Sequence, residues 1–148
     1  MSAEAVKIVD ARLQRLHDYW LAKKGDRRFP ARADIAPEEI RDILPWVFIM
    51  ERVEARLRYR LVGEAFREMY GDRLMGLFID EVDLDHITAA YIGEYDTCIQ
   101  TGGPVARQWK FVKLSGRHLD YERLILPLSN DGTSINMFLC GAVGFGYG

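Results

Sequence analysis

The side chains that could bind a metal ion are few and far apart in this chain. They are three histidines, His17, His86 and His118, and two cysteines, Cys98 and Cys140. Structural zinc sites use cysteine and histidine at short, regular spacings such as CxxC. Neither the histidines nor the cysteines show such a spacing, so the sequence predicts no metal site.

Sequence motifs of enzyme active sites are also missing. The chain has no GxSxG, P-loop, HExxH or Rossmann fingerprint. The glycine-rich stretch GFGYG has no predicted helix after it that would present backbone amides to a phosphate. Acidic residues gather at 80–85, yet no His or Lys is paired with them for acid–base chemistry. We therefore expect a protein without a catalytic site.

Length and composition fit one globular domain. At 148 residues, with 49% hydrophobic and 28% charged residues, the chain can form a core without disulfides or metals. The net charge of −2 gives no general attraction to nucleic acid or to an anionic membrane. The basic run KKGDRR fits a solvated connector better than a phosphate-binding patch. The apolar runs are far shorter than ~18 residues, so we expect no membrane span and a cytoplasmic protein.

An amphipathic helix is predicted at 4–22. Its apolar residues recur at steps of three and four, and they are Val6, Val9, Leu13, Leu16 and Trp20. Gly25 and Pro30 mark the end of this helix and the connector that follows. We place a helical lead and its connector at 1–35 and the core at 36–148, within one structural domain.

The core begins with a strand hairpin and an abrupt change of pattern. After a short helix in APEEIRDIL, strands are predicted at 46–53 and 56–62, and only two residues separate them. In RYRLVGEAFREMYG the two-residue alternation stops at Gly63, and helical spacing predicts a short helix at 64–70. One face of the alternation holds Arg58, Arg60 and Val62.

A longer helix, capped by Asp83, is predicted at 84–100, and three strands follow at about 105–114, 118–128 and 134–145. The middle strand has Leu124, Leu126 and Leu128 on one face and Tyr121, Arg123 and Ile125 on the other. Because both faces carry apolar residues, the sheet should be covered on both sides. This order predicts an α+β fold, in which a helical cap covers one face of a five-stranded antiparallel sheet and the amphipathic helix is left for the other face or a second subunit.

The cap and the strands resemble those of a known family. Gly63, Ala65, Phe66, Gly71, Gly76 and the acidic stretch IDEVD follow the general pattern of a PAS domain. The blocks YWLAKKGDRRFPARADIAPEEIRDILPWVFI, RYRLVG and YERLILPLSNDG, in this order, resemble a proteobacterial PAS variant family of single-domain proteins. The resemblance implies a non-catalytic sensory or regulatory module in bacterial signalling that binds a small organic ligand, a protein partner or both. A pure interaction adaptor with a filled core is one alternative, and a small-molecule enzyme on a cone-shaped α+β fold is another.

PAS domains have a cavity between the sheet and the longer cap helix. The side chains expected to line it are Tyr59, Tyr91, Tyr95, Cys98, Trp109 and Met137, although the same residues can simply pack as core. Arg107 lies on the same side of its strand as Trp109. If that side faces inward, Arg107 is a buried charge that needs Glu94 or a ligand carboxylate as its partner.

No cofactor is expected in this cavity. Haem in PAS domains takes an axial His from the longer helix, whereas His86 lies in the first turn of that helix. Covalent flavin photochemistry needs Cys in an Asn-Cys-Arg context, which DRLMGLF lacks.

Two further expectations concern packing. The N-terminal stripe is too long to hide easily on one small sheet, which predicts a homodimer through Val6, Val9, Leu13, Leu16 and Trp20. Phe66, at the start of the cap helix, should be buried.

Overall fold

The computed structural model describes residues 6–70, 74–82, 88–112, 116 and 118–147. Its helices are α1 (Ala11–Lys24), α2 (Glu64–Tyr70) and α3 (Thr88–Thr101). Its strands are β1 (Val47–Val53), β2 (Arg56–Val62), β3 (Val105–Val112), β4 (His118–Leu128) and β5 (Met137–Tyr147). Single 3-10 turns occur at Arg32–Asp34, Pro37–Ile40, Leu44–Trp46 and Ile79–Glu81.

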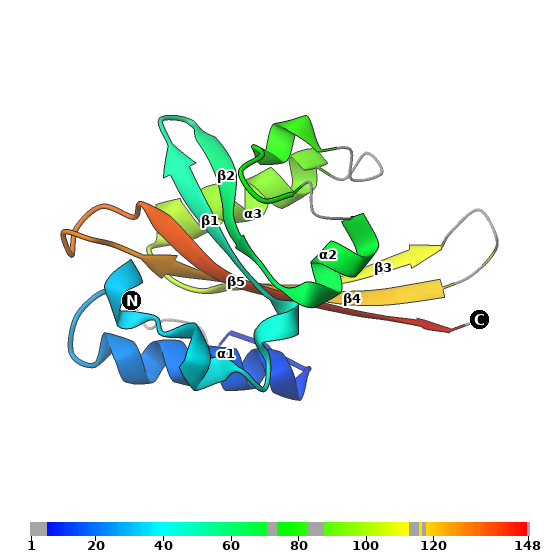
Figure 1. Ribbon diagram of the computed structural model, residues 1–148, viewed down its shortest axis with the longest axis horizontal. Coiled ribbons are helices and arrows are strands. Elements are labelled where there is room, and N and C mark those ends of the chain that lie inside the picture. Colours follow the sequence, from blue (N-terminus) through cyan, green and yellow to red (C-terminus); the bar gives the residue numbers. More distant parts are fainter. Residues whose placement is uncertain (1–5, 71–73, 83–87, 113–115, 117, 148) are drawn as a thin grey trace.

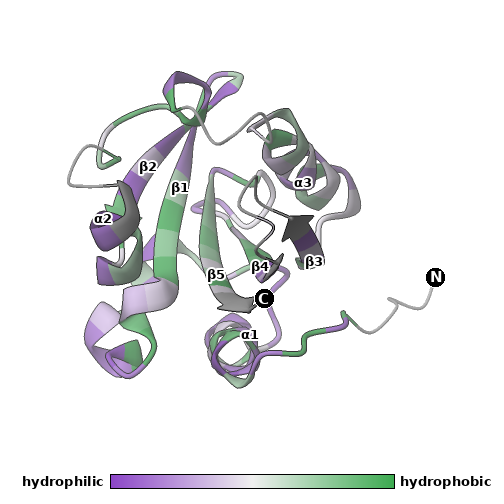
Figure 2. Cartoon of the chain, turned by 90° about the vertical axis from the view of Figure 1, so that its right-hand side faces the viewer, coloured by the Kyte–Doolittle hydropathy of each residue, from purple (hydrophilic) through white to green (hydrophobic). Residues whose placement is uncertain are grey.

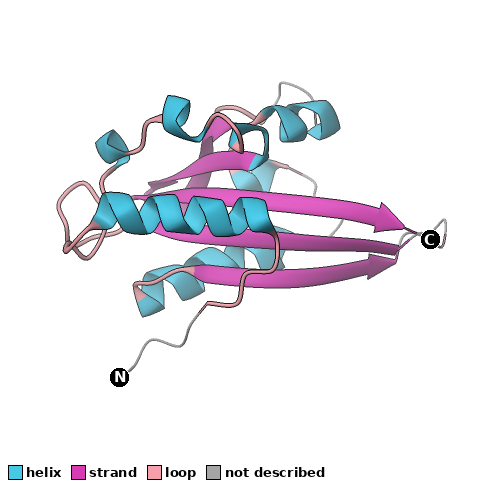
Figure 3. Ribbon diagram, turned by 90° about the horizontal axis from the view of Figure 1, so that it is seen from below, coloured by secondary structure: helices cyan, strands magenta, loops and turns pink. Residues whose placement is uncertain are grey.

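All five of these strands pair in one antiparallel sheet, in the order β2-β1-β5-β4-β3. Figure 1 shows α1 below the sheet and α2 and α3 above it. Seen from below, α1 lies over the sheet and runs along the direction of its long strands (Figure 3). The predicted hairpin, the three later strands and their antiparallel pairing are therefore confirmed, as is the α+β architecture.

The N-terminal helix begins later than predicted. Asp10 caps it, because its carboxylate accepts a hydrogen bond from the Arg12 amide at 2.8 Å. Residues 6–10 run into this cap without forming a helix. The prediction of a helix from residue 4 is therefore wrong for the described residues before Ala11. At the other end, Gly25 adopts a φ of +57°, a conformation that favours glycine, and closes the helix.

A bulge in the first hairpin corrects the predicted alternation of β2. The register with β1 shifts between Ile49 and Met50, so Arg60 has no partner opposite it. Beyond the bulge, Leu61 turns towards the α1 face, and Val62 joins the core on the α3 face. The prediction that Val62 shares a face with Arg58 is therefore wrong.

The face of the sheet under α1 has its own apolar core. Leu13, Leu16 and Trp20 of α1 pack there against the three leucines of β4 that the sequence placed on one face. The approach is close, because a Cβ atom on Gly141 of β5 would lie 2.6 Å from Leu13 Cδ2. The Trp20 indole also donates to the Pro127 carbonyl at 2.9 Å. The two-sided burial predicted for the sheet is confirmed.

The opposite face holds a second core, formed by α2, α3 and the inward side of the strands. Phe66 of α2 is 8% exposed, as predicted, and packs edge-on against Phe48 with ring centroids 5.1 Å apart. Figure 2 shows α3 on the opposite side of the sheet from α1. The residues that α3 buries are Tyr91, Glu94, Tyr95 and Cys98. The predicted cap at Asp83 and the first residues of the predicted 84–100 helix lie outside the described residues. Within the described residues, this helix is α3, from Thr88 to Thr101.

Candidate functional site

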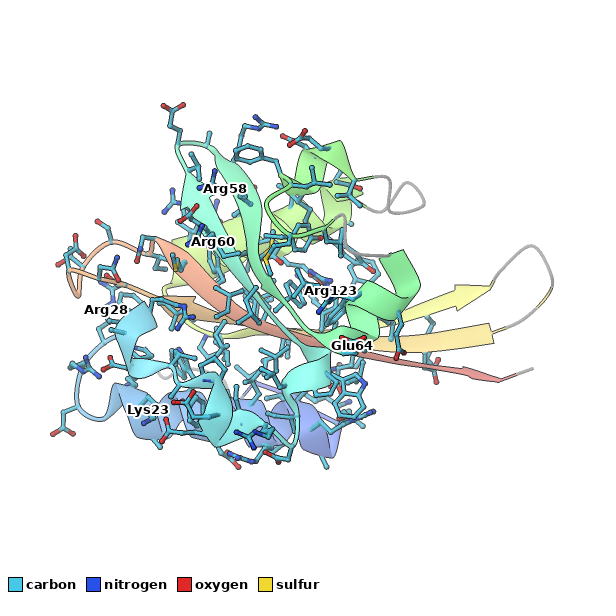
Figure 4. The ribbon with its side chains drawn as sticks, in the orientation of Figure 1. Lys23, Arg28, Arg58, Arg60, Glu64 and Arg123 are labelled. Carbon is cyan, nitrogen blue, oxygen red and sulfur yellow. The ribbon has the colours of Figure 1, made fainter. Side chains whose placement is uncertain are left out.

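A buried ion pair joins α3 to the middle of the sheet. Arg123 of β4 donates from Nε to Glu94 Oε1 of α3 at 2.7 Å, and the two side chains are only 6% and 3% exposed. Alternation along β4 turns Arg123 to the same face as Ile125, and helical spacing on α3 turns Glu94 to the same side as Tyr91 and Tyr95. Figure 4 places the Arg123 side chain in the interior of the molecule.

Polar and aromatic neighbours surround this ion pair. The Trp109 indole donates to the second oxygen of Glu94 at 2.9 Å. The guanidinium carbon of Arg123 lies 3.8 Å from the centroid of the Tyr91 ring, a cation–π contact. Nη2 of Arg123 reaches the Tyr95 hydroxyl at 3.4 Å. Each charge is therefore matched by specific partners, as a desolvated ion pair requires.

Burial and neighbouring groups together fix the protonation states at this site near neutral pH. Burial alone would lower the pKa of Arg123, but its interactions with Tyr95 and Glu94 outweigh burial, so the pKa of Arg123 lies above its ordinary value. Burial likewise raises the pKa of Tyr95 well above 10. It also raises the pKa of Cys98 to about 12 and that of Cys140 above its ordinary value. We therefore assign Arg123 as a cation and Tyr95, Cys98 and Cys140 as neutral.

Arg123 also forms part of the wall of a small cavity between the sheet and the cap. The cavity has a volume of about 20 Å³. Its lining residues are Phe48, Tyr59, Val62, Phe66, Leu74, Tyr91, Tyr121 and Arg123. Since a single water needs roughly 10–15 Å³ by this measure, the space as it stands accommodates about one water.

The structure brings together most of the side chains predicted for this site. Tyr59 and Tyr91 line the cavity, Tyr95 and Cys98 are buried in the same core, and Trp109 packs against that core. Whether a ligand contacts them stays a prediction.

Two of the predicted site residues lie elsewhere. Arg107 is exposed, and the arginine bound to Glu94 is Arg123, the residue opposite it on β4. Met137 packs on the α1 face of the sheet, away from the cavity. A signal for Arg123 was present in the sequence, because the alternation of β4 placed it on the same face as Ile125.

A second polar site, on the α1 face, was not predicted from the sequence. The Glu122 carboxylate accepts hydrogen bonds from the backbone amides of Val9 and Asp10, both at 2.7 Å, and it is 4% exposed. Gln108 of β3 donates to the same carboxylate at 2.6 Å and to the Lys7 carbonyl at 3.1 Å. Glu122 thus holds residues 7–10 on the sheet just before α1 begins.

The apolar residues of α1 are covered within the same chain, so they give no support for a homodimer. Leu13, Leu16 and Trp20 are at most 3% exposed, because α1 packs on the sheet of its own chain. Val6 and Val9 precede the helix, and Val9 is 67% exposed. The expectation of an uncovered apolar stripe is therefore wrong, and association of two copies stays a prediction without that support.

The described residues form neither a metal-binding cluster nor a membrane-spanning helix. No three His, Cys, Asp or Glu side chains gather there in a way that could hold a metal ion. No helix in this part of the chain has the length and apolar character needed to cross a membrane. His86, the histidine within the predicted 84–100 helix, lies outside the described residues.

A five-stranded antiparallel sheet of order 2-1-5-4-3, with helices packed across it above a small interior site, is a PAS-like fold. The crystal structure of the PAS domain of a protein from Colwellia psychrerythraea matches it with a TM-score of 0.51 at 9% sequence identity, covering 73% of this chain and 95% of that one. A family model described as PAS domain matches residues 9–142, so the chain belongs to the PAS domain family. No curated protein matches the sequence. PAS domains are typically sensory or signalling modules.

Proposed function

We propose that this chain is a non-catalytic sensory module that binds a small organic molecule between α3 and the sheet and reports it to a protein partner. The observation that carries the proposal is the buried Arg123–Glu94 pair beside the aromatic cavity. Replacing a buried ion pair by apolar residues of similar volume is often neutral or stabilising, so stability alone does not require the pair. A charge beside a cavity is, by contrast, what recognition of a polar ligand needs.

The placement of the pair supports a role in sensing. Glu94 belongs to α3 and Arg123 to β4, so the interaction spans the interface at which a ligand would enter. A ligand that engages Arg123 changes how firmly α3 is held to the sheet, and such a differential interaction can shift the equilibrium between two conformations. Catalysis is not part of the proposal, because both oxygens of Glu94 are already hydrogen-bonded.

An adaptor with a filled core is the second candidate. The cavity volume of about 20 Å³ favours it, since the described conformation has no room for an organic molecule. In this case Arg123 and Glu94 only orient α3, and the protein acts through its surface.

Native mass spectrometry of freshly purified protein distinguishes the two candidates. We expect the intact mass under native conditions to exceed the denatured mass by that of a bound molecule. Leu74→Phe puts a larger side chain at the cavity wall and so reduces the space inside. Met75→Phe introduces the same residue at the neighbouring position, which is 54% exposed, and serves as the control. Loss of the adduct in the first variant only supports the sensor. No adduct, together with no resonance shift of core residues by any member of a fragment library, establishes the adaptor.

A further inference from the structure

The guanidinium of Arg123 is only partly used by its carboxylate partner. Glu94 accepts from Nε through one oxygen, and its other oxygen accepts from Trp109. The other hydrogen-bond partners of this guanidinium are neutral: Nη2 reaches the Tyr95 hydroxyl at 3.4 Å, and Tyr121 also shares a hydrogen bond with the Arg123 side chain. Arginine binds carboxylates most strongly through two parallel N–H···O bonds, which the Glu94 contact does not form.

The lining of the cavity suits an acid with a short apolar body. Arg123 is the one charged residue among the eight that line it. Tyr59, Tyr91 and Tyr121 contribute phenol groups, which combine an apolar ring with a polar tip, and the other four are apolar. A negative charge bound there faces a cation and no lining carboxylate.

Charge balance determines what must happen when such an acid enters. Arg123 and Glu94 already neutralise each other, and both are desolvated. A second carboxylate beside them would leave one negative charge without a partner in the core, which is strongly unfavourable. Ala90 and Thr97 lie on the same side of α3 as Glu94, one turn before and after it, and they are exposed and half-buried. Glu94 is therefore at the edge of the buried face, and a small rotation or displacement of α3 returns it to solvent.

We infer that the site binds a small monocarboxylate, which replaces Glu94 on Arg123 and thereby releases α3 from β4. This inference rests on the proposed function, because it names the ligand class of the same site. The present cavity has room for about one water, so the exchange must widen the space under α3. Formate and acetate are therefore the first probes.

The test uses the whole protein and the indole signals of its three tryptophans. In ¹⁵N-labelled protein, sodium acetate should shift the Trp109 indole N–H signal saturably, because its acceptor Glu94 moves. The Trp20 indole, bonded to Pro127 on the other face, is the internal control and should not shift. Acetamide and matched sodium chloride control for shape and for ionic strength, and neither should act on Trp109.

Two variants examine the exchange itself. In Glu94→Gln the carboxylate that competes for Arg123 is gone. Acetate then gains a charge-assisted hydrogen bond to Arg123 without breaking the Arg123–Glu94 ion pair, so it should bind about tenfold more tightly. Arg123→Lys keeps the charge without the planar fork, and acetate should bind it about tenfold more weakly. If Glu94→Gln folds poorly, a rise of its melting temperature with acetate, but not with acetamide, gives the same answer by linkage.

Three results would overturn the inference. Equal shifts of Trp109 with acetate and acetamide, no shift with acetate or formate, or unchanged acetate affinity in Glu94→Gln each contradict carboxylate exchange. If a neutral fragment shifts core resonances and carboxylates do not, the proposed sensor function still holds and only the carboxylate inference is wrong. If no fragment and no acid shifts the core resonances, both the proposed sensor function and the carboxylate inference are wrong.

Discussion

Removing the buried cation should destabilise the protein strongly, and removing the whole pair should not. Arg123→Met leaves the Glu94 carboxylate, 3% exposed, without its cation and with the neutral Trp109 indole as a donor. Breaking a buried pair in this way costs about 3–5 kcal/mol. Such a loss is a large part of the 5–15 kcal/mol that holds a typical domain together, and it lowers the melting temperature by roughly 10–20 °C in a chain of this size.

The double variant Glu94→Leu/Arg123→Met should recover most of that loss, because no charge is then left in the core. Urea denaturation followed by far-UV circular dichroism measures all three proteins. Arg56→Met is the matched control, since the Arg56–Asp80 pair has the same 2.7 Å separation but is nearly half exposed, and its loss should hardly change the midpoint. If Arg123→Met behaves like this control, or if the double variant is no more stable than the single one, the reasoning from the buried charge is wrong.

Three further predictions concern other parts of the core. Phe66→Ala should lower the free energy of unfolding by about 3–5 kcal/mol, measured by urea denaturation, and an unchanged midpoint would mean that α2 does not pack on Phe48. Cys98 and Cys140 should resist a thiol reagent at pH 8 in the folded protein and react fully in urea, since burial raises the pKa of both thiols; fast labelling before unfolding would contradict their burial. Burial lowers the pKa of His17 below 6.5, so the unfolded chain takes up the proton first and stability should fall as the pH drops through 6.5. His17→Gln should remove that part of the fall in melting temperature, and an identical pH profile would exclude His17 as its source.

The sequence predicted the strands and the two covered faces because both follow from local alternation. The leucines of β4 and Ile125 lie on opposite faces, as a period of two requires. The same rule puts Arg107 and Arg123 on equivalent sides of paired strands, yet only Arg123 is buried. β3 is the edge strand, so a side chain there can reach solvent, whereas β4 lies inside the sheet. Strand order is a property of the whole fold, and a local pattern does not contain it.

Two other errors have a similar origin. The stripe at Val6 and Val9 continues the helical spacing, but Asp10 starts the helix later, and the backbone before it is bound by Glu122, more than a hundred residues away. The sequence does not contain the register of Met137, which was predicted to line the cavity, and its pairing with Leu128 puts it on the α1 face. In each case the deciding contact joins segments that are distant in the chain.

Neighbouring residues of β4 serve opposite faces of the sheet: Glu122 holds the entry to α1, and Arg123 holds α3. On β3, Gln108 and Trp109 repeat this division. A planar peptide joins each pair, so a movement of the strand at one residue displaces the other as well. Coupling of this kind is reciprocal: if an occupant under α3 loosens residues 6–10, then a force or a partner that draws those residues away must change the affinity for the occupant by the same factor. Either site, the space under α3 or the segment 6–10, can therefore receive the signal that the other reports.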